Sequence, residues 1–486
     1  MAQAAQAQDA TQKAYDTVIG LEVHVQLMTK TKAFSACATS FGAEENEFIC
    51  PVSFGLPGSL PVLNKRVVEM AILLGKATGC TINHESVLAR KNYFYPDLPK
   101  GYQISQYDKP ICEHGTLPIL LDGEVKNIGI TRIHIEEDAG KSMHGGGGSL
   151  IDFNRAGTPL LEIVSEPVIR SADEATAYLK VMRQLVRTLG VSDGNMEEGS
   201  FRCDANVSVR PTQNDPFGTR TELKNINSFR FISRAIEYEA DRQWDALQHG
   251  EKIVQETRLY DAEKGRTYSM RSKEEAHDYR YFPDPDLLPL VIDDAMIKDV
   301  TADMPELPWQ RRERFESAFG LSTYDAEVLT ADDTLAAYYE AVVTDGIDAK
   351  TVANWVTSEL LGALNQRGWD MSQNPIGADR LQGLLKLLAA DKITGKIAKE
   401  VFAKMFETDD APDKIVASMG VEQINDEGAV EAIVAQVIAE NPGQVEQFKG
   451  GKDKLFGFFV GQVMKVSRGQ ANPQLTQEIL RRKLAE

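Results

Sequence analysis

Apolar and polar residues alternate along residues 18–27, near the start of the chain. Apolar side chains occupy every second position, namely Ile19, Leu21, Val23, Val25 and Leu27. Because side chains two apart on a strand point to the same side, this period predicts a β-strand with one buried face. The other face carries Glu22, His24 and Gln26. A carboxylate and an imidazole at this spacing suit a metal site or an acid–base pair, although an exposed polar strand face has the same pattern.

Two further apolar stretches contain carboxylates. Residues 133–138 include His134, Glu136 and Glu137, and residues 160–164 include Glu162. A carboxylate inside an apolar strand is energetically costly unless it is paired with a cation or bound to a metal. These acids therefore favour a functional role for the polar face of the first strand.

The same patterns predict the fold class. Strands are predicted at residues 18–27, 129–137, 150–153, 160–164, 201–210 and 219–224, and helices at 65–75, 172–189 and 228–249. Many strands with few regular strand–helix–strand repeats indicate an α+β domain with a mostly antiparallel sheet. After a proline-rich boundary near residue 293, helical patterns occupy 332–344, 351–366, 381–390, 394–408, 429–440 and 445–465. They predict two all-α C-terminal modules, divided near an acidic run at 409–413.

Composition restricts the possible partners. The chain has 486 residues, a formal net charge of −19 and five scattered cysteines. The charge argues against a protein that coats nucleic acid nonspecifically, and the unpaired cysteine count favours a reducing, cytoplasmic setting. No apolar stretch is long enough to cross a membrane, and the Ala/Gln-rich start has no secretory pattern. The last segment, residues 449–486, reverses the balance with eight basic against three acidic residues. It suits either a polyanion-binding surface or a solvated helix face.

Two polar segments offer groups for phosphate or nucleotide binding. Residues 90–103 combine Arg, Lys, Tyr and Pro, and are predicted to form a proline-stiffened loop whose cations contact phosphate and whose tyrosines stack on a base. A loop of this composition equally suits a purely structural role, in which it covers one end of a sheet. Residues 201–210 alternate, which places Arg202, Asp204, Asn206 and Ser208 on one face, followed by Glu222 and Lys224. The chain has no Walker, Rossmann or kinase motif, so a nucleotide site here would be of an unfamiliar kind.

Long phrases of the chain resemble the B-subunit family of bacterial aspartyl/glutamyl-tRNA amidotransferases. The matching phrases are IGLEVHVQL, SFGLPGSLPVLNK, RKNYFYPDLPKGYQISQY, HIEEDAGKS, GTPLLEIVSEP, MEEGSFRCDANVSVRP, ELKNINSF, DYRYFPDPDLLPL, KIAKEVF and FFVGQVMKVSRGQANPQL. They extend from about residue 18 to residue 475, nearly the whole chain. Several are long and irregular, so chance similarity does not explain them.

This resemblance implies a domain order and a reaction. The implied parts are a disordered tail at 1–14, a cradle-like catalytic domain at 15–293, a helical domain at 294–408 and a tRNA-binding helical tail domain at 409–486. Family members use ATP to phosphorylate the side-chain carboxylate of misacylated Glu-tRNA(Gln) or Asp-tRNA(Asn). An amidase-type A subunit supplies ammonia from glutamine, and a small C subunit completes a heterotrimer. A non-discriminating aminoacyl-tRNA synthetase is a further candidate partner.

The resemblance also implies roles for individual residues. The metal ligands would be Glu22, His24, Glu137 and Glu162, binding Mg²⁺, with Mn²⁺ as the alternative because of the histidine. The remaining assignments are Lys91, Glu136 and Asp204 for catalysis, Lys91, Arg202 and Lys224 for ATP or phosphate, and Lys452, Lys454, Lys465 and Arg468 for tRNA. Strand alternation places Glu136, not Glu137, on the polar face. A strand end or bulge after Ile135 is therefore expected, with Glu136 beside the ligands.

One departure from the family concerns zinc. Some members carry four cysteines where this chain has Ser35, Cys37, Cys50 and Ser53. A closed structural zinc site needs four ligands, so no structural zinc is expected.

Two other functions fit parts of the pattern. A non-catalytic tRNA-binding scaffold would keep the helices and tail but would not need the acidic cluster. A metal-dependent hydrolase would use the acids without an ATP site or a basic tail. Which misacylated tRNA is the substrate depends on the synthetases of the cell.

Overall fold

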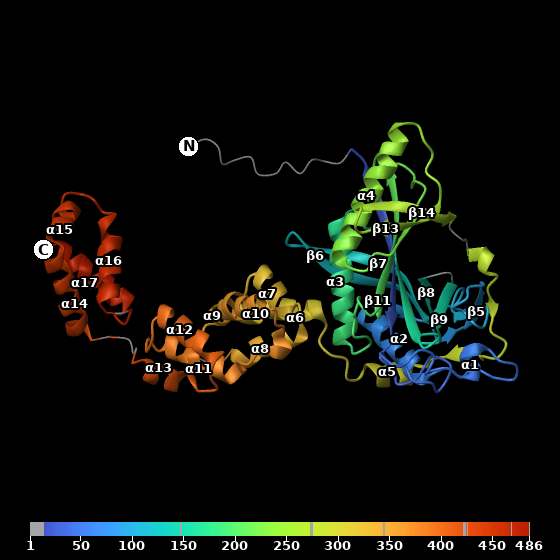
Figure 1. The fold of residues 1–486 in the computed structure, drawn as a ribbon, viewed down its shortest axis with the longest axis horizontal. Helices are drawn as coiled ribbons and strands as arrows, with labels where there is room; N and C mark the ends of the chain where they lie inside the picture. Colours follow the sequence, from blue (N-terminus) through green and yellow to red (C-terminus); the bar gives the residue numbers. More distant parts are fainter. Residues whose placement is uncertain are drawn as a thin grey trace. The chain divides into compact units, whose positions relative to one another are not determined.

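The computed structural model describes residues 14–145, 148–272, 276–343, 346–420, 424, 426–467 and 469–485. They form two compact units, Met1–Gln310 and Arg311–Glu486 (Figure 1). The predicted tail at 1–14 falls, except for Ala14, outside the described residues. The division into three folded domains stays a prediction. Within the described residues, no helix has the length and apolar character needed to cross a bilayer.

The first unit is built on one large sheet. Within its described residues, nine strands follow the order β14-β13-β12-β11-β1-β10-β7-β6-β2. Their bounds are β1 Asp16–Gln26, β2 Thr81–Ile82, β6 Cys112–Leu121, β7 Glu124–Glu137, β10 Pro159–Ser165, β11 Phe201–Arg210, β12 Thr221–Lys224, β13 Glu256–Asp261 and β14 Arg266–Ser272. Every neighbouring pair is antiparallel except β12 and β13. The predicted α+β class with a mostly antiparallel sheet is confirmed.

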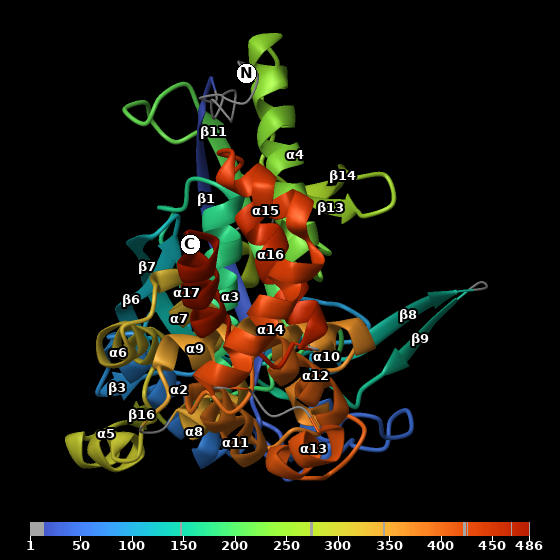
Figure 2. The same ribbon diagram turned by 90° about the vertical axis from the view of Figure 1, so that its left-hand side faces the viewer.

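Helices cover the apolar face of this sheet (Figure 2). The helices of the unit are α1 Pro51–Phe54, α2 Lys65–Ala77, α3 Ala172–Thr188, α4 Phe229–Gln248 and α5 Asp294–Thr301, with a 3₁₀ turn at Ala276–Tyr279. Ser171 and Ser228 cap α3 and α4 by accepting hydrogen bonds from backbone N–H groups of the first turn. The buried side chains of α2, α3 and α4 join those of the sheet in one core. The opposite face of the sheet is thereby left for polar residues.

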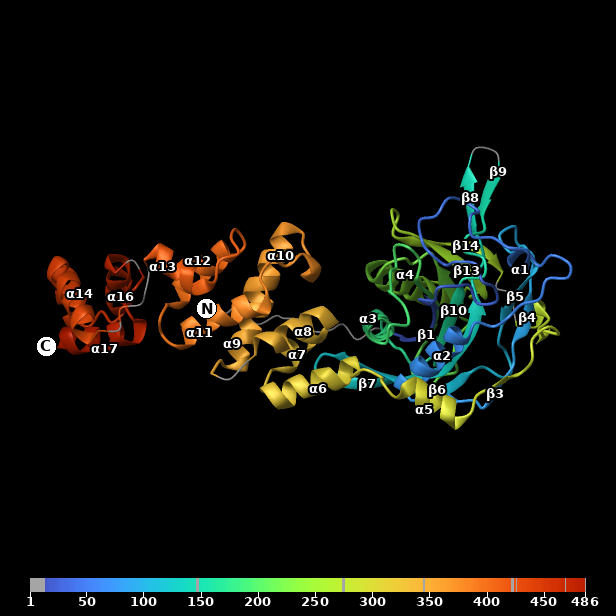
Figure 3. The same ribbon diagram turned by 90° about the horizontal axis from the view of Figure 1, so that it is seen from below.

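Small sheets flank the large one (Figure 3). Their strands are β3 Glu85–Ser86, β4 Ala89–Asn92, β5 Tyr102–Ser105, β8 Lys141–Gly145, β9 Gly148–Asp152, β15 Phe282–Pro283 and β16 Leu290–Val291. β4 pairs with both β5 and β15, so the prediction that residues 90–103 form a loop is wrong at both ends. β15 lies far along the chain from β4, and a local pattern carries no trace of that pairing.

The second unit is helical. Its helices are α6 Pro308–Phe319, α7 Thr323–Thr330, α8 Asp333–Val342, α9 Ala349–Asn354, α10 Leu361–Arg367, α11 Ala378–Ala389, α12 Gly395–Met405, α13 Pro412–Met419, α14 Glu427–Glu440, α15 Pro442–Lys449, α16 Leu455–Val466 and α17 Pro473–Ala485, with a π-helical stretch at Trp355–Leu360 and a 3₁₀ turn at Met371–Gln373. Buried side chains of its described part form two cores, one over residues 315–416 and one over 430–484. The single helix predicted at 445–465 is two, because Gly450 and Gly451 interrupt it, the latter at φ +94°.

Candidate active site

The polar face of β1 is the centre of the candidate site. Ile19, Leu21 and Val23 are completely buried in the core, whereas Glu22 and His24 lie on the opposite face and are half-buried. The alternation predicted from the sequence is therefore confirmed. Because β1 lies between β10 and β11, polar residues from both neighbours are brought beside Glu22 and His24.

Strand register aligns one polar residue from each of four strands. His24 on β1 is opposite Arg202 on β11 and opposite Glu162 on β10. Glu162 is in turn opposite His134 on β7. Directly opposite residues in antiparallel pairs have their Cβ atoms about 5 Å apart. The register alone thus forms a row of Arg202, His24, Glu162 and His134 across the sheet.

The first cluster of this face is centred on Glu162. Its Oε2 atom lies 3.3 Å from His24 Nε2 and 3.5 Å from His134 Nε2. Glu136, two positions after His134 on β7, places Oε1 3.4 Å from the same His134 nitrogen. Ligand atoms of His24, Glu136 and Glu162 all lie within 4.8 Å of one another. These side chains form a compact set of nitrogen and oxygen donors on the polar face.

Lys91 joins this cluster from β4. Its Nζ atom lies 3.5 Å from Glu136 Oε1, while Ser105 Oγ and Gln103 Nε2 donate hydrogen bonds to the same carboxylate at 2.6 and 3.1 Å. Burial raises the pKa of Glu136, but the charge of Lys91 together with the hydrogen bond and charge of His134 outweighs it, and the pKa falls to about 2. Burial lowers the pKa of Lys91, and the charge of Glu136 raises it well above its usual value. Both groups are therefore charged at neutral pH.

The two histidines are held by the same carboxylates. Burial lowers the pKa of His134, but the charge of Glu162 and hydrogen bonds with Glu136 and Glu162 outweigh it, raising the pKa to about 9. For His24, burial likewise lowers the pKa, and its hydrogen bond with Glu162 together with the charges of Glu162 and Asp204 raises it overall. Sequence reasoning did not assign His134 to the site. Its position two residues before Glu136 was the signal that it shares the polar face.

A second cluster lies beside the first, around Glu22, which precedes His24 on β1 by two residues. Glu22, Asp204 on β11 and Glu222 on β12 offer ligand atoms within 4.8 Å of one another. Lys224 Nζ lies 2.5 Å from Asp204 and 3.7 Å from Glu222. Burial lowers the pKa of Lys224, and the charges of Asp204 and Glu222 raise it overall. Three carboxylates against one ammonium leave excess negative charge, which a divalent cation would neutralise.

Arg202 forms an ion pair with Asp138. Its Nη2 atom lies 2.8 Å from Asp138 Oδ2, which also accepts a hydrogen bond from Gln26 Nε2 at 2.8 Å. Burial raises the pKa of Asp138, and the charges of Arg202 and Arg155 lower it overall. A phosphate that binds Arg202 must therefore compete with Asp138, and the predicted phosphate role of Arg202 stays a prediction.

Glu137 does not lie where the implied ligand set needs it. Its carboxylate forms an ion pair with Lys100 and accepts a hydrogen bond from the Ile104 N–H group at 3.0 Å. β7 pairs in regular register with β10 through Glu136 and Glu137, and the register shift lies at Val164/Ser165. The expected bulge after Ile135 is thus corrected. Alternation places Glu136 beside His24 and Glu162, and Glu22 belongs to the second cluster. The metal-binding roles themselves stay predictions.

The donor set fits a hard or borderline divalent cation. Carboxylate oxygens suit Mg²⁺, and an imidazole among them also suits Mn²⁺. His24, Glu136 and Glu162 would hold one such ion, and Glu22, Asp204 and Glu222 offer oxygens beside it.

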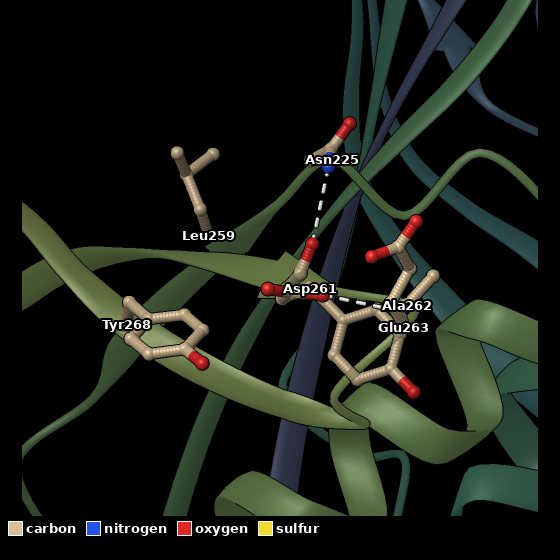
Figure 4. A pocket seen from close by; sticks show the side chains of 7 residues that line it. Asn225, Leu259, Asp261, Ala262, Glu263 and Tyr268 are labelled. Carbon is tan, nitrogen blue, oxygen red and sulfur yellow. Dashed lines mark hydrogen bonds between the residues drawn. The ribbon is translucent and has the colours of Figure 1, made fainter.

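A shallow hollow of about 350 Å³ lies just beyond Lys224 (Figure 4). It is lined by Asn225, Leu259, Tyr260, Asp261, Ala262, Glu263 and Tyr268. Asn225 adopts φ +63° and donates a hydrogen bond from Nδ2 to the Tyr260 carbonyl oxygen at 3.1 Å. The two carboxylates of its lining disfavour phosphate. An uncharged group suits this hollow better than an anion.

The predicted tRNA-binding side chains lie in the second unit. Lys452, Lys454 and Lys465 are exposed, and Lys452 Nζ donates a hydrogen bond to Gln447 Oε1 at 3.0 Å. Arg468, the fourth predicted member, lies outside the described residues. Exposure permits phosphate contact, and the role stays a prediction.

Cys37 and Cys50, at the position where some family members carry four cysteines, have pKa values shifted in opposite directions. Cys50 Sγ accepts a hydrogen bond from the Ser53 N–H group at 3.5 Å and lies 3.3 Å from Ser53 Oγ. Burial raises the pKa of Cys50, but these hydrogen bonds outweigh it, and the pKa falls to about 7. Burial raises the pKa of Cys37. The absence of structural zinc stays a prediction.

We expect Cys50 to be the most reactive cysteine of the chain at neutral pH. Because its pKa is lowered, about half of its thiol is thiolate at pH 7, whereas buried Cys80, Cys112 and Cys203 have raised pKa values. Iodoacetamide labelling read by peptide mass spectrometry should modify Cys50 first. Its labelling should be roughly fivefold slower at pH 6 than at pH 7, because the thiolate fraction falls from about a half to about a tenth. Ser53→Ala should slow the reaction at pH 7. Equal labelling of Cys37 and Cys50 at pH 7 would contradict the assignment.

Comparisons with known proteins identify what this architecture is similar to. Residues 17–298 match the model of the GatB/GatE catalytic domain, and residues 337–484 match that of the GatB domain. A Geobacter sulfurreducens protein is 59% identical over 475 residues, covering 97% of this chain and 99% of the relative. Relatives from Alkalilimnicola ehrlichii and Syntrophotalea carbinolica are 58% and 57% identical over 474 and 471 residues, covering 97% of this chain and 99% and 98% of theirs. All three are named as the B subunit of aspartyl/glutamyl-tRNA(Asn/Gln) amidotransferase.

Proposed function

The chain belongs to the B-subunit family of aspartyl/glutamyl-tRNA(Asn/Gln) amidotransferases, and from this premise we propose that it activates a tRNA-bound carboxylate with ATP. The substrate is misacylated Glu-tRNA(Gln), Asp-tRNA(Asn) or both. Ammonia comes from a glutaminase A subunit, and a small C subunit completes a cytoplasmic heterotrimer. The product is Gln-tRNA(Gln) or Asn-tRNA(Asn).

One observation supports this proposal above the others. One polar face of the sheet carries two clusters of possible metal ligands, each with a lysine beside it. The first consists of His24, Glu136 and Glu162, and the second of Glu22, Asp204 and Glu222. Phosphoryl transfer needs cations that neutralise charge as it develops, and carboxylates that hold metal ions. A scaffold that only binds tRNA needs neither group.

The proposed reaction has two balanced steps. An oxygen of the substrate's side-chain carboxylate attacks the γ-phosphorus of ATP, the bond to the β-phosphate oxygen breaks, and ADP leaves. Ammonia then attacks the carbonyl carbon of the acyl phosphate. The bond from carbon to the phosphate oxygen breaks, releasing phosphate and a proton and leaving the amide.

The residues of the site have separate tasks in these steps. Lys91 is half-buried, charged and held toward Glu136, which suits it to offset negative charge on a transferring phosphoryl group. In the second cluster, Lys224 similarly forms an ion pair with Asp204. A bound divalent cation would neutralise phosphate charge and orient the oxygens. Gln103 and Ser105 fix the Glu136 carboxylate by hydrogen bonds.

Reconstitution tests the proposed function. The chain is combined with A and C subunits and misacylated tRNA, and amide formation is measured with and without ATP. ATP-dependent Gln-tRNA or Asn-tRNA formation supports the proposal. Tight tRNA binding without ATP consumption would make the chain a scaffold, and tRNA-independent hydrolysis would make it a hydrolase.

The exposed tail lysines should contribute the salt dependence of tRNA binding. Neutralised phosphates release counterions, so log K falls by roughly 0.9 per phosphate contact for each log unit of salt. Lys452→Ala, Lys454→Ala and Lys465→Ala should each reduce that slope by roughly this amount, because each variant removes one cation from the tail. Matched Lys→Arg variants keep the charge and should keep the slope. Titration of tRNA at several salt concentrations measures it, and unchanged slopes in all three alanine variants would leave the tail structural.

A further inference from the structure

A chain of five tyrosine rings lies beside the first acidic cluster. We define the tyrosine array as Tyr95, Tyr93, Tyr279, Tyr281 and Tyr107, in spatial order. Successive ring centroids are 5.9, 6.0, 6.1 and 4.5 Å apart, the first three contacts edge-on and the last stacked with 9° between the planes. The rings come from the segments after β4, after β5 and before β15. Three segments distant in the sequence therefore supply one continuous aromatic surface.

The array is connected to the site at two points. Lys91 Nζ lies 5.1 Å from the centroid of the Tyr279 ring and 3.5 Å from Glu136 Oε1. The Tyr93 hydroxyl donates a hydrogen bond to Gln103 Oε1 at 3.3 Å, and Gln103 Nε2 donates to Glu136 at 3.1 Å. The middle of the array is therefore connected to Lys91 directly and to Glu136 through Gln103.

Both ends of the array are open to solvent. Tyr95 and Tyr107 are each 42% exposed, and Phe94 beside Tyr95 is 79% exposed. A small aromatic core would bury such rings rather than present them. Arg280, between Tyr279 and Tyr281, is exposed, and among the described residues its side chain has no ion-pair partner. Aromatic faces with an uncommitted guanidinium are the elements that bind single-stranded nucleic acid.

We propose that the tyrosine array is the stacking surface for the unpaired 3′-terminal nucleotides of the aminoacyl-tRNA. This rests on the proposed function, in which the amino acid on the terminal ribose must reach Lys91 and Glu136. The middle of the array lies beside those two residues, and on either side the array leads to an exposed ring, Tyr95 or Tyr107. A single adenine of ATP would occupy one ring, whereas rings exposed at both ends accommodate several successive bases. Arg280 supplies a phosphate contact along that path.

The test removes one exposed ring at a time in the complete amidotransferase complex. Tyr107→Ala and Tyr95→Ala should each weaken binding of misacylated tRNA by roughly 5- to 150-fold, the range for loss of one stacked base. Tyr107→Phe keeps the ring and should bind as the parent does. Phe41→Ala removes another exposed ring, 77% exposed and outside the array, and should have no effect.

A shortened tRNA makes the test specific. With the terminal unpaired nucleotides removed, Tyr107→Ala and the parent should bind equally, because the missing bases no longer stack. A tRNA with 2-aminopurine in place of one of the unpaired bases before the last should lose fluorescence on binding the parent and lose less on binding Tyr95→Ala or Tyr107→Ala.

Three results would overturn the inference. Equal affinities for intact tRNA would make the array structural packing. Equal losses for intact and shortened tRNA would place the contact elsewhere on tRNA. A raised KM for ATP with unchanged tRNA affinity would make the array a site for the ATP base. Each is separate from failure of the proposed function, which would appear as no ATP-dependent amide formation by the parent complex.

Discussion

Glu162→Gln should reduce ATP-dependent activation of the tRNA-bound carboxylate at least about a hundredfold, the scale of losing one charge-stabilising group in an active site. Glu162 contacts both half-buried His24 and buried His134, so its amide replacement leaves the two imidazoles without their shared negative charge. It also removes an oxygen donor from the cluster that would hold a divalent cation. Single-turnover formation of the acyl phosphate in the assembled complex measures the loss, and Mn²⁺ binding to the chain gives a second readout.

The control for this variant is a carboxylate on the same segment. Glu166→Gln lies just past β10, outside both clusters, and can still accept the hydrogen bond from Thr131 Oγ1 at 2.8 Å. It should retain activity and Mn²⁺ binding. Subunit assembly and the melting temperature of Glu162→Gln show whether the fold is intact. Near-normal activation by a folded Glu162→Gln complex would remove Glu162 from the proposed site.

Lys91→Met should lower the rate of carboxylate phosphorylation by about a hundredfold or more while sparing tRNA affinity. Lys91 is the cation beside Glu136, and methionine keeps its length and its contact with the Tyr279 ring without its charge. The effect should appear in single-turnover activation at saturating tRNA. Glutamine hydrolysis by the partner subunit should persist, since this change leaves that subunit untouched.

Lys109→Met provides the comparison for Lys91. Lys109 is exposed and pairs with Glu85 at 2.6 Å, so its loss should alter neither activation nor binding. If Lys91→Met instead weakens tRNA binding and leaves single-turnover activation intact, Lys91 contacts the tRNA backbone. Its proposed part in phosphoryl transfer would then be wrong.

Local periodicity was sufficient for the elements that build the polar face. The alternation of Ile19, Leu21 and Val23 predicted β1, and the strand predicted at 201–210 has the bounds of β11. The helices predicted at 65–75, 172–189 and 228–249 correspond to α2, α3 and α4. These elements carry their signal within a few turns or residues of sequence, which is why a local pattern suffices.

Elements defined by distant partners were harder to predict. β4 is a strand because β5 and β15 pair with it on both sides, and prolines nearby favoured a loop. Similarly, the helix predicted at 445–465 breaks at Gly450 and Gly451, where helical periodicity continues on both sides of a positive-φ turn. The sequence pattern describes single segments, and these features depend on pairing or on a turn.

Alternation predicted which side chains of β7 share the polar face. It placed Glu136 on the polar face, where the structure brings it beside His24 and Glu162, and it placed Glu137 with Ile135 on the other side. His134 follows from the same rule. The division of the carboxylates into two clusters follows from the register of five strands, which no single stretch of sequence contains.

The position of β1 within the sheet has a consequence for synthesis of the chain. β1 is the earliest of the described strands, yet both neighbours, β10 and β11, are translated later, and Asn206, which bonds to Glu22, follows it by 184 residues. At 5–20 residues per second this interval lasts roughly 10–40 s. Until β10 is made, β1 has no native strand partner, and its edge toward β11 stays unpaired for the whole interval. Nascent chains stalled before β11 should therefore be held by ribosome-associated chaperones, and release from them should coincide with emergence of Arg210.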